Sequence, residues 1–161
     1  MLQNAEAYAK PEDIKQYIGE AYFFRAYSYF DLLQLYGDVI ITKKPLDITD
    51  PEMKVKRNDR SEVVDLIIDD LNHAVENLPA FKELTTEEEG RISKEGAQAF
   101  LSRVALYEGT WQKSRNGNQN TQRSANLLDI AAKAARTVID AKYGYTFRLF
   151  GTDSETKILG D

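Results

Sequence analysis

Residues 22–39, YFFRAYSYFDLLQLYGDV, place aromatic or aliphatic side chains on nearly every face of a helix, with one arginine among them. A surface helix carries a single apolar stripe, whereas a helix that is apolar almost all round is buried. The pattern therefore predicts that residues 22–36 form the buried central helix of an all-helical body. Pro11 suits a first helical turn and Gly37 suits a left-handed stop, so this helix should run from about Glu12 to Tyr36.

A second segment has the cleanest amphipathic pattern in the chain. It opens at residues 59–62 and ends at Pro79, which cannot continue a helix. Apolar residues recur at i, i+3 and i+4, and acids, asparagine and histidine fill the other side. The predicted buried stripe is Val63, Val64, Ile67, Ile68, Leu71, Ala74, Val75 and Leu78.

Two further helices are predicted in the second half. One begins after Ser93 as its N-cap and reaches about Thr110; its small residues favour close antiparallel packing. The next opens at Ser124 and closes at Tyr143 and Gly144. The small residues of the third helix are Gly96, Ala97, Ala99 and Ala105, and the stripe of the fourth is Leu127, Leu128, Ala131, Ala135, Val138 and Ile139.

Three irregular spans separate these helices, at residues 37–58, 79–92 and 112–123. The last has no apolar residue and should be a solvent-exposed loop. Residues 145–150, YTFRLF, alternate with period two, which is typical of a strand. The predicted fold class is all-α, with antiparallel helix pairs resembling degenerate tetratricopeptide repeats. The long loops depart from the roughly 34-residue unit with its short turn.

Composition bounds the function. The chain has 161 residues, a formal net charge of −5, 42% hydrophobic residues and no cysteine. This fits one globular domain, and the scattered cations among more numerous acids argue against a nucleic-acid partner. No run reaches the roughly 18 apolar residues of a membrane span, and the first residues lack the pattern of a signal peptide. Without cysteine this polypeptide has no disulfide, thiolate metal site or lipid attachment of its own.

Four sequence blocks, in order, resemble the SusD/RagB family of nutrient-binding lipoproteins. They are RAYSYFDLLQLYGDV (25–39), RSEVVDLIIDDLNHAVENLP (60–79), GRISKEGAQAFLSRVALYEGTW (90–111) and ANLLDIAAKAARTVIDAKYGYTF (125–147). The resemblance covers residues 18–150. The chain departs from the family after Gly37, where Asp38-Val39-Ile40 replaces the usual Gly-Val-Pro. It also lacks the family's signal peptide, lipid-bearing cysteine and large C-terminal part.

The resemblance implies a single SusD-like helical-repeat domain at residues 1–150, with a tail at 151–161, as a fragment of a longer protein. The full-length protein would be a lipid-anchored protein of the outer membrane. Its expected partners are a TonB-dependent SusC-like transporter and an oligosaccharide that it captures without hydrolysis. The helical part would act as scaffold and docking surface. No cofactor is expected.

A sugar site needs flat aromatic faces for the apolar side of a pyranose and polar groups for its hydroxyls. The candidate is Trp111, the only tryptophan, which precedes a polar loop with Asn116, Asn118, Gln119 and Asn120. The alternative is that Trp111 continues the stripe Ala97, Leu101, Val104 and Glu108 and packs structurally. Helical spacing favours this alternative.

The other chemistry-bearing residues fit structural roles. Asp69 and Glu76 flank His73 at helical spacing, yet one helix cannot complete a metal shell, so no metal site is predicted. The acids Asp69-Asp70 and 87–89 do not face each other across a cleft, and no nucleophile motif is present, so the chain should not be an enzyme. Arg25, embedded among aromatic residues, should be structural, paired with Asp31 or an acid of the second helix.

Two other classes of protein remain as alternatives to the glycan-capturing lipoprotein. The first is a generic tetratricopeptide-like adaptor that binds a protein or peptide in a helical groove. The second is an enzyme, for which the sequence offers only scattered carboxylates. The residues that precede Met1 in the complete gene separate the first two: a lipobox there supports the lipoprotein, and a plain cytoplasmic start supports the adaptor.

Overall fold

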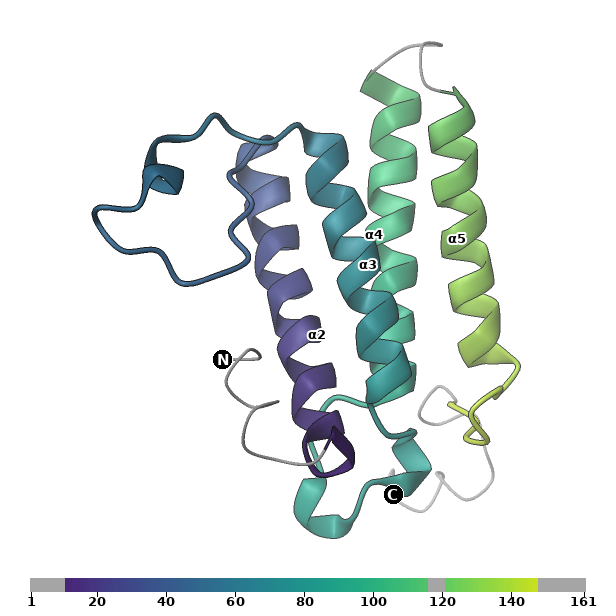
Figure 1. Cartoon of the computed structure of the whole chain (residues 1–161). Helices are drawn as coiled ribbons and strands as arrows, with labels where there is room; N and C mark the ends of the chain where they lie inside the picture. Colours follow the sequence, from purple (N-terminus) through teal and green to yellow (C-terminus); the bar gives the residue numbers. More distant parts are fainter. Residues whose placement is uncertain (1–10, 116–120, 148–161) are drawn as a thin grey trace, which may run out of the picture.

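Four long helices run alternately up and down in a row in the computed structural model (Figure 1), which describes residues 11–115 and 121–147. They are α2 (Pro11–Tyr36), α3 (Arg60–Asn77), α4 (Lys94–Arg115) and α5 (Thr121–Ile139). Helix α2 pairs with α3 and α4 pairs with α5, while α3 and α4 join the pairs. The predicted all-α class with antiparallel helix pairs is confirmed. No helix in the described part of the chain has the length and apolar character needed to cross a membrane.

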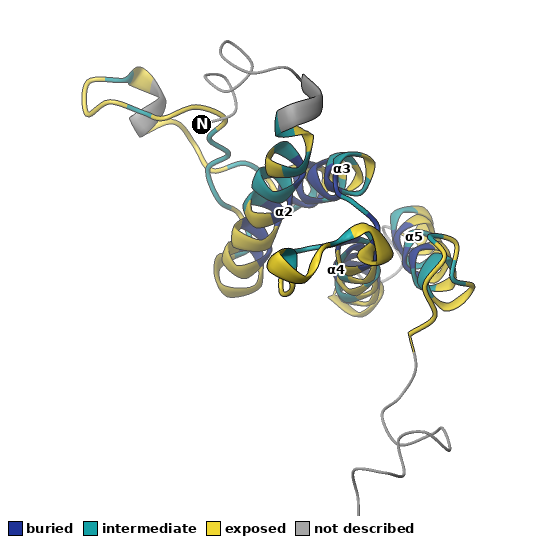
Figure 2. Cartoon of the chain, turned by 90° about the horizontal axis from the view of Figure 1, so that it is seen from below, coloured by how far each residue is buried: buried dark blue, intermediate teal, exposed yellow. Residues whose placement is uncertain are grey.

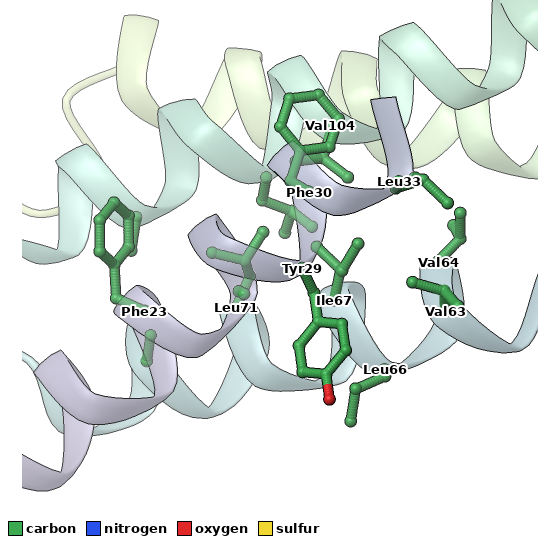
Figure 3. Close-up of a cluster of buried hydrophobic side chains, with 14 of the residues drawn as sticks. Phe23, Tyr29, Phe30, Leu33, Val63, Val64, Leu66, Ile67, Leu71 and Val104 are labelled. Carbon is green, nitrogen blue, oxygen red and sulfur yellow. The ribbon is translucent and has the colours of Figure 1, made fainter. Parts of the chain in front are cut away.

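The core lies between α2, α3 and α4 (Figure 3). Phe23, Phe30 and Leu33 of α2 meet Ile67 and Leu71 of α3, as the amphipathic pattern of that helix predicts. The predicted stripe of α3 is buried, with Ile68 and Val75 at its partly covered edge. Its start is fixed by the backbone N–H of Asp59, which donates to the Glu62 carboxylate at 3.1 Å.

The prediction that α2 is buried on nearly all faces is wrong. One side is buried, but Phe24, Tyr27, Leu35 and Tyr36 are 47–75% exposed. Figure 2 shows exposed positions along the side of α2 that faces away from the other helices. Because α2 is the first helix of the row, it packs against a neighbour on one side and leaves its other aromatic residues to solvent. The apolar sequence of α2 indicates which side chains are suited to burial, but the positions of the neighbouring helices decide which of them are buried.

Helices α4 and α5 come close at small residues. A Cβ added to Gly109 would lie 3.0 Å from two side-chain carbons of Leu128, and the Ser124 hydroxyl donates to the Gly109 carbonyl at 2.8 Å. The prediction of close antiparallel packing is confirmed, although Gly96 and Ala99 are exposed and Gly109 marks the nearest approach.

The ends of these helices differ from the prediction. Ser93 caps α4 as expected, because Gly96 N–H donates to its hydroxyl at 3.3 Å. Helix α4 continues to Arg115, five residues beyond Thr110, and α5 begins at Thr121, so that Ser124 lies inside the helix. Polar residues such as Lys113 and Arg115 are compatible with a helix that projects beyond the core.

Helix α5 also ends earlier than predicted, at Ile139 rather than near Gly144. Ala141 takes the left-handed conformation, with φ of 51°. The amides of Ala141 and Lys142 bond back to the carbonyls of Val138 and Thr137, which is a Schellman end. Residues 145–147 form no strand, and 148–150 lie outside the described residues, as does the proposed tail at 151–161.

The connections carry short 3₁₀ turns, η1 (Pro51–Lys54), η2 (Phe81–Glu83) and η3 (Thr86–Glu88). Residues 37–58 leave α2 at Gly37, whose φ of 71° gives the predicted left-handed stop, and return through a bridge between Val39 and Asn58. Arg91 holds the second connection to α2 with two bonds to Glu20, at 2.7 and 2.9 Å.

Candidate functional site

Trp111 lies half-buried near the C-terminal end of α4. The guanidinium carbon of Arg60 stands 4.0 Å from the centre of its ring, so one face of the indole is occupied by a cation. The predicted polar partners at residues 116–120 lie outside the described residues. The sugar-binding role of Trp111 therefore stays a prediction, and its contact with Arg60 supplies a packing role beside it.

Arg60 is the centre of a buried polar network that the sequence did not reveal. Its Nε donates to both carboxylate oxygens of Glu108, at 2.9 and 3.2 Å, and its Nη1 donates to the Leu33 carbonyl at 3.3 Å. Gln112 donates to the same carboxylate at 2.7 Å. Glu108 is fully buried, and these partners offset the cost of removing its charge from water. The network ties the end of α2 to α3 and α4.

Arg25 finds its partner in Asp70, an acid of the second helix as one prediction allowed, and not in Asp31. Its Nε and Nη2 donate to the two Asp70 oxygens at 2.7 and 2.6 Å, and the Tyr22 ring lies 5.2 Å from its guanidinium carbon. The hydrogen bond to Asp70 raises the pKa of Arg25. Asp70 is fully buried.

The acids singled out from the sequence lie on two separate elements, helix α3 and the connection that precedes α4. Asp69 points away from its neighbour Asp70 toward His73, at 3.8 Å, and His73 stacks on Tyr22 with ring centres 5.0 Å apart. Residues 87–89 lie in the connection before α4. Among residues 11–115 and 121–147, no cluster of three His, Cys, Asp or Glu side chains could hold a metal ion.

A groove of about 570 Å³ runs between α3 and α5. Its floor is aliphatic and its rim is polar, and Arg123 spans it with a 2.8 Å bond to Asp65. Amide and carboxylate groups can bind hydroxyl-rich ligands, yet the groove offers no aromatic face on which a sugar could stack. It is lined by Asp65, Ile68, Asp69, Asn72, Gln122, Arg123, Asn126, Leu127 and Ile130.

The outer face of α2, which we define as Phe24, Tyr27, Leu32 and Leu35, is an apolar surface on the opposite edge of the row. These four side chains are 39–75% exposed. Tyr27 stacks on Phe100 of α4, with ring centres 5.4 Å apart, so the surface continues toward α4. Exposed apolar side chains of this kind are more typical of a contact with another protein than of a catalytic site, although the exposed Ser28 and Asp31 lie among them on the same side of α2.

The fold is that of a helical-repeat protein whose four helices pack in antiparallel pairs. Its residues 1–106 match the family described as "Starch-binding associating with outer membrane". This chain belongs to the SusD-like family, and its helices are the repeat-containing part of the SusD-like fold. SusD-like binding proteins are non-catalytic.

Individual relatives agree with this assignment. A SusD-like protein, P38, from Formosa agariphila is 37% identical over 93 residues, which are 57% of this chain and 17% of that protein. A crystal structure of a SusD-like protein from Bacteroides fragilis matches 92% of this chain and 25% of its own, with 30% identity and a TM-score of 0.70. A laminarin-binding SusD-like protein matches 88% and 27%, with 27% identity and a TM-score of 0.65. The chain thus spans about a quarter or less of the relatives it matches.

Proposed function

We propose that the full-length protein containing this chain captures a glycan at the outer membrane and presents it to a TonB-dependent, SusC-like transporter without hydrolysing it. The observation that carries the proposal is the family match over residues 1–106. The likeness to a laminarin-binding protein supports a glycan as ligand. The chain itself has no cysteine, so the lipid anchor would be attached elsewhere in the full-length protein.

Within that protein the four helices serve as scaffold and docking surface. The outer face of α2 supports this role, because its exposed aromatic and aliphatic side chains gain by being covered, at roughly 25 cal/mol per Å² of apolar area. We assign this face to the contact with the transporter. A generic tetratricopeptide-like adaptor would use the outer face of α2 for a protein or peptide partner. Membership of the SusD-like family weighs against that alternative.

Two measurements test the proposal. In the first measurement, the full-length protein is incubated with laminarin and with soluble starch. Binding is followed as retention of the protein on each glycan, and hydrolysis is followed as release of reducing ends. We expect retention on at least one glycan and no release. Retention on neither, or hydrolysis of either, would contradict the capture function.

The second measurement tests docking by co-purification of the full-length protein with a SusC-like transporter. The variant Phe24→Glu/Leu35→Glu places charges on the outer face of α2, where both residues are exposed, so the fold should persist. Ile139→Glu, on α5, is the matched control, because Ile139 is 69% exposed at the other edge of the row. Recovery of the transporter should fall with the double variant alone. Equal recovery with both variants would place the contact elsewhere.

A further inference from the structure

Three aromatic rings meet beside the connection between α3 and α4, a connection that Figure 1 shows at the lower end of the row of helices. Phe81, from η2, meets Tyr145 and Phe147, which follow α5. The ring centres are 4.6, 5.5 and 4.8 Å apart, and each pair of rings is inclined by about 60°. We call Phe81, Tyr145 and Phe147 the aromatic triad. Sequence reasoning missed the triad, because Phe81 lies 64 residues before Tyr145 and 66 before Phe147 in the chain.

The triad is more exposed than the rings of the core. Phe23 and Phe30 in the core are 7% and 3% exposed. The rings of Phe81, Tyr145 and Phe147 remain 41%, 40% and 47% exposed. Each therefore presents a large part of its surface to solvent while its neighbours fix its position.

The backbone at Phe81 is held by hydrogen bonds to acidic side chains. The N–H of Phe81 donates to the buried carboxylate of Glu95 at 2.8 Å, and the N–H of Ala80 donates to Glu83 at 2.8 Å. The Lys82 side chain lies against Gly144, whose φ of 84° excludes a larger residue without strain. A site held in this way binds without a large ordering cost.

A hollow of about 310 Å³ lies beside Phe81. That volume is at the lower end of the range for small-molecule sites, and the hollow combines one aromatic ring with two hydroxyl groups and a carboxylate. The C–H face of a pyranose can lie on the ring while its hydroxyls reach the polar groups. The lining residues are Phe81, Leu84, Thr85, Thr86, Glu89 and Gly90.

The charge of this region favours a neutral ligand. Residues 79–91 carry four glutamates against one lysine and one arginine, and that arginine, Arg91, is already paired with Glu20. An acidic polysaccharide would be repelled. A protein partner would need about 800 Å² on each side for a stable interface, whereas three rings and a small hollow provide the contact area of one or two sugar units.

We propose that the aromatic triad and the adjoining hollow form a glycan subsite for one or two units of a neutral polysaccharide. A pyranose stacks on Phe81 and Tyr145, and its hydroxyls bind Thr86 and Glu89. The inference rests on the proposed capture function and gives it a second contact point. The subsite lies near the N-terminal end of α4, and Trp111 lies 17 residues further along that helix from Lys94, about 26 Å at 1.5 Å per residue.

The test uses the full-length protein with laminarin as neutral polymer and polygalacturonate as acidic polymer. Phe81→Ala removes the stacking ring, and Thr86→Ala/Glu89→Gln removes polar groups from exposed positions without touching the core. Tyr36→Ala is the control, because Tyr36 is an exposed aromatic residue at the C-terminal end of α2, away from the triad. A melting curve accompanies each variant.

We expect Phe81→Ala and Thr86→Ala/Glu89→Gln to bind laminarin at least fivefold more weakly than the wild type. The affinity of the Tyr36→Ala control for laminarin should stay within twofold of wild type, and polygalacturonate should not bind. Laminarin should also slow amide hydrogen exchange in residues 81–90 of the wild type. If Phe81→Ala melts early, Thr86→Ala/Glu89→Gln decides the matter.

Wild-type affinity in Thr86→Ala/Glu89→Gln, with no protection of residues 81–90, overturns the subsite and leaves the capture function standing. If the Phe81→Ala and Thr86→Ala/Glu89→Gln variants keep their affinity for laminarin but no longer co-purify with the transporter, the glycan subsite is overturned in favour of a protein contact. Failure of the wild type to bind laminarin and soluble starch alike removes the capture function, and the subsite with it.

Discussion

Arg25→Met should destabilise the fold by about 3 kcal/mol, because it leaves the Asp70 carboxylate buried without its cation. Methionine keeps most of the length and apolar character of the arginine side chain, so packing against α3 changes little. Two hydrogen bonds disappear, at 2.7 and 2.6 Å, together with the opposite charge. The perturbation therefore isolates the ion pair between α2 and α3.

The expected size follows from the burial of the two partners. Removing one partner of a buried ion pair costs about 3–5 kcal/mol. The Asp70 side chain is 1% exposed, but that of Arg25 is 28% exposed, so water already weakens the pair and the lower end of the range applies. For a protein of this size, 3 kcal/mol corresponds to a fall of about 6–12 °C in the melting temperature.

Urea unfolding followed by far-ultraviolet circular dichroism measures this loss, and a double-mutant cycle tests its cause. Asp70→Leu combined with Arg25→Met removes both charges and should recover most of the stability lost by Arg25→Met. Lys133→Met is the control, because the Lys133–Asp129 pair on α5 is exposed and worth only about 0.3–0.5 kcal/mol.

Two results would refute the reasoning. A loss below 1 kcal/mol in Arg25→Met would mean that Asp70 does not depend on the guanidinium. A double variant no more stable than Arg25→Met would mean that the loss comes from packing of the arginine stem. Because the hydrogen bond to Asp70 raises the pKa of Arg25 above its ordinary value, the arginine is protonated at all moderate pH values and its own titration adds no pH dependence there.

Three further predictions concern the helix ends and the packing of α4 on α5. Ala141→Gly should raise the free energy of unfolding by about 0.5–1 kcal/mol in urea, since glycine adopts the φ of 51° without strain; an unchanged or lower value would contradict the Schellman end. Gly109→Ala should lower the free energy of unfolding by about 1 kcal/mol, because the added Cβ would lie 3.0 Å from Leu128. Gly96→Ala should raise it, because the nearest neighbours of the added Cβ lie at 3.8 Å or more. Changes of the same sign in both variants would contradict the close approach of α4 and α5 at Gly109. Burial first, and then the charge of Glu95, raise the pKa of Tyr143 above 10.0, so the stability it contributes is complete below pH 10.0 and falls as the pH rises through the folded-state pKa. Tyr143→Phe should flatten this alkaline loss in urea unfolding repeated on either side of pH 10.0, and an identical slope would rule out Tyr143 as its source.

Local features of the fold were predictable because they depend on residues close in the chain. The apolar period of α3, the cap at Ser93 and the stop at Gly37 follow from helix geometry and backbone freedom alone. The burial of Glu108 was also predictable, since an acid on the apolar stripe of Ala97, Leu101 and Val104 must be buried with a partner. Asp70, next to Leu71 on the buried side of α3, carried the same signal.

Relations between distant residues came only from the tertiary structure. It paired Arg25 with Asp70 and Arg60 with Glu108, and it brought Phe81 to Tyr145 and Phe147. Periodicity reports which residues of one helix share a face, but it does not report which helix lies opposite, so these partners could not be chosen from sequence.

The aromatic segment 22–36 shows both sides of this division. Sequence alone determined that it forms a helix ending at Gly37, and its residues carry the resemblance to the SusD-like family that the comparisons confirm. Only the tertiary structure decided that Phe23, Phe30 and Leu33 enter the core while Phe24 and Leu35 face outward. The reason is geometric: a helix at the edge of a row has a neighbour on one side, and no property of its own sequence supplies a second.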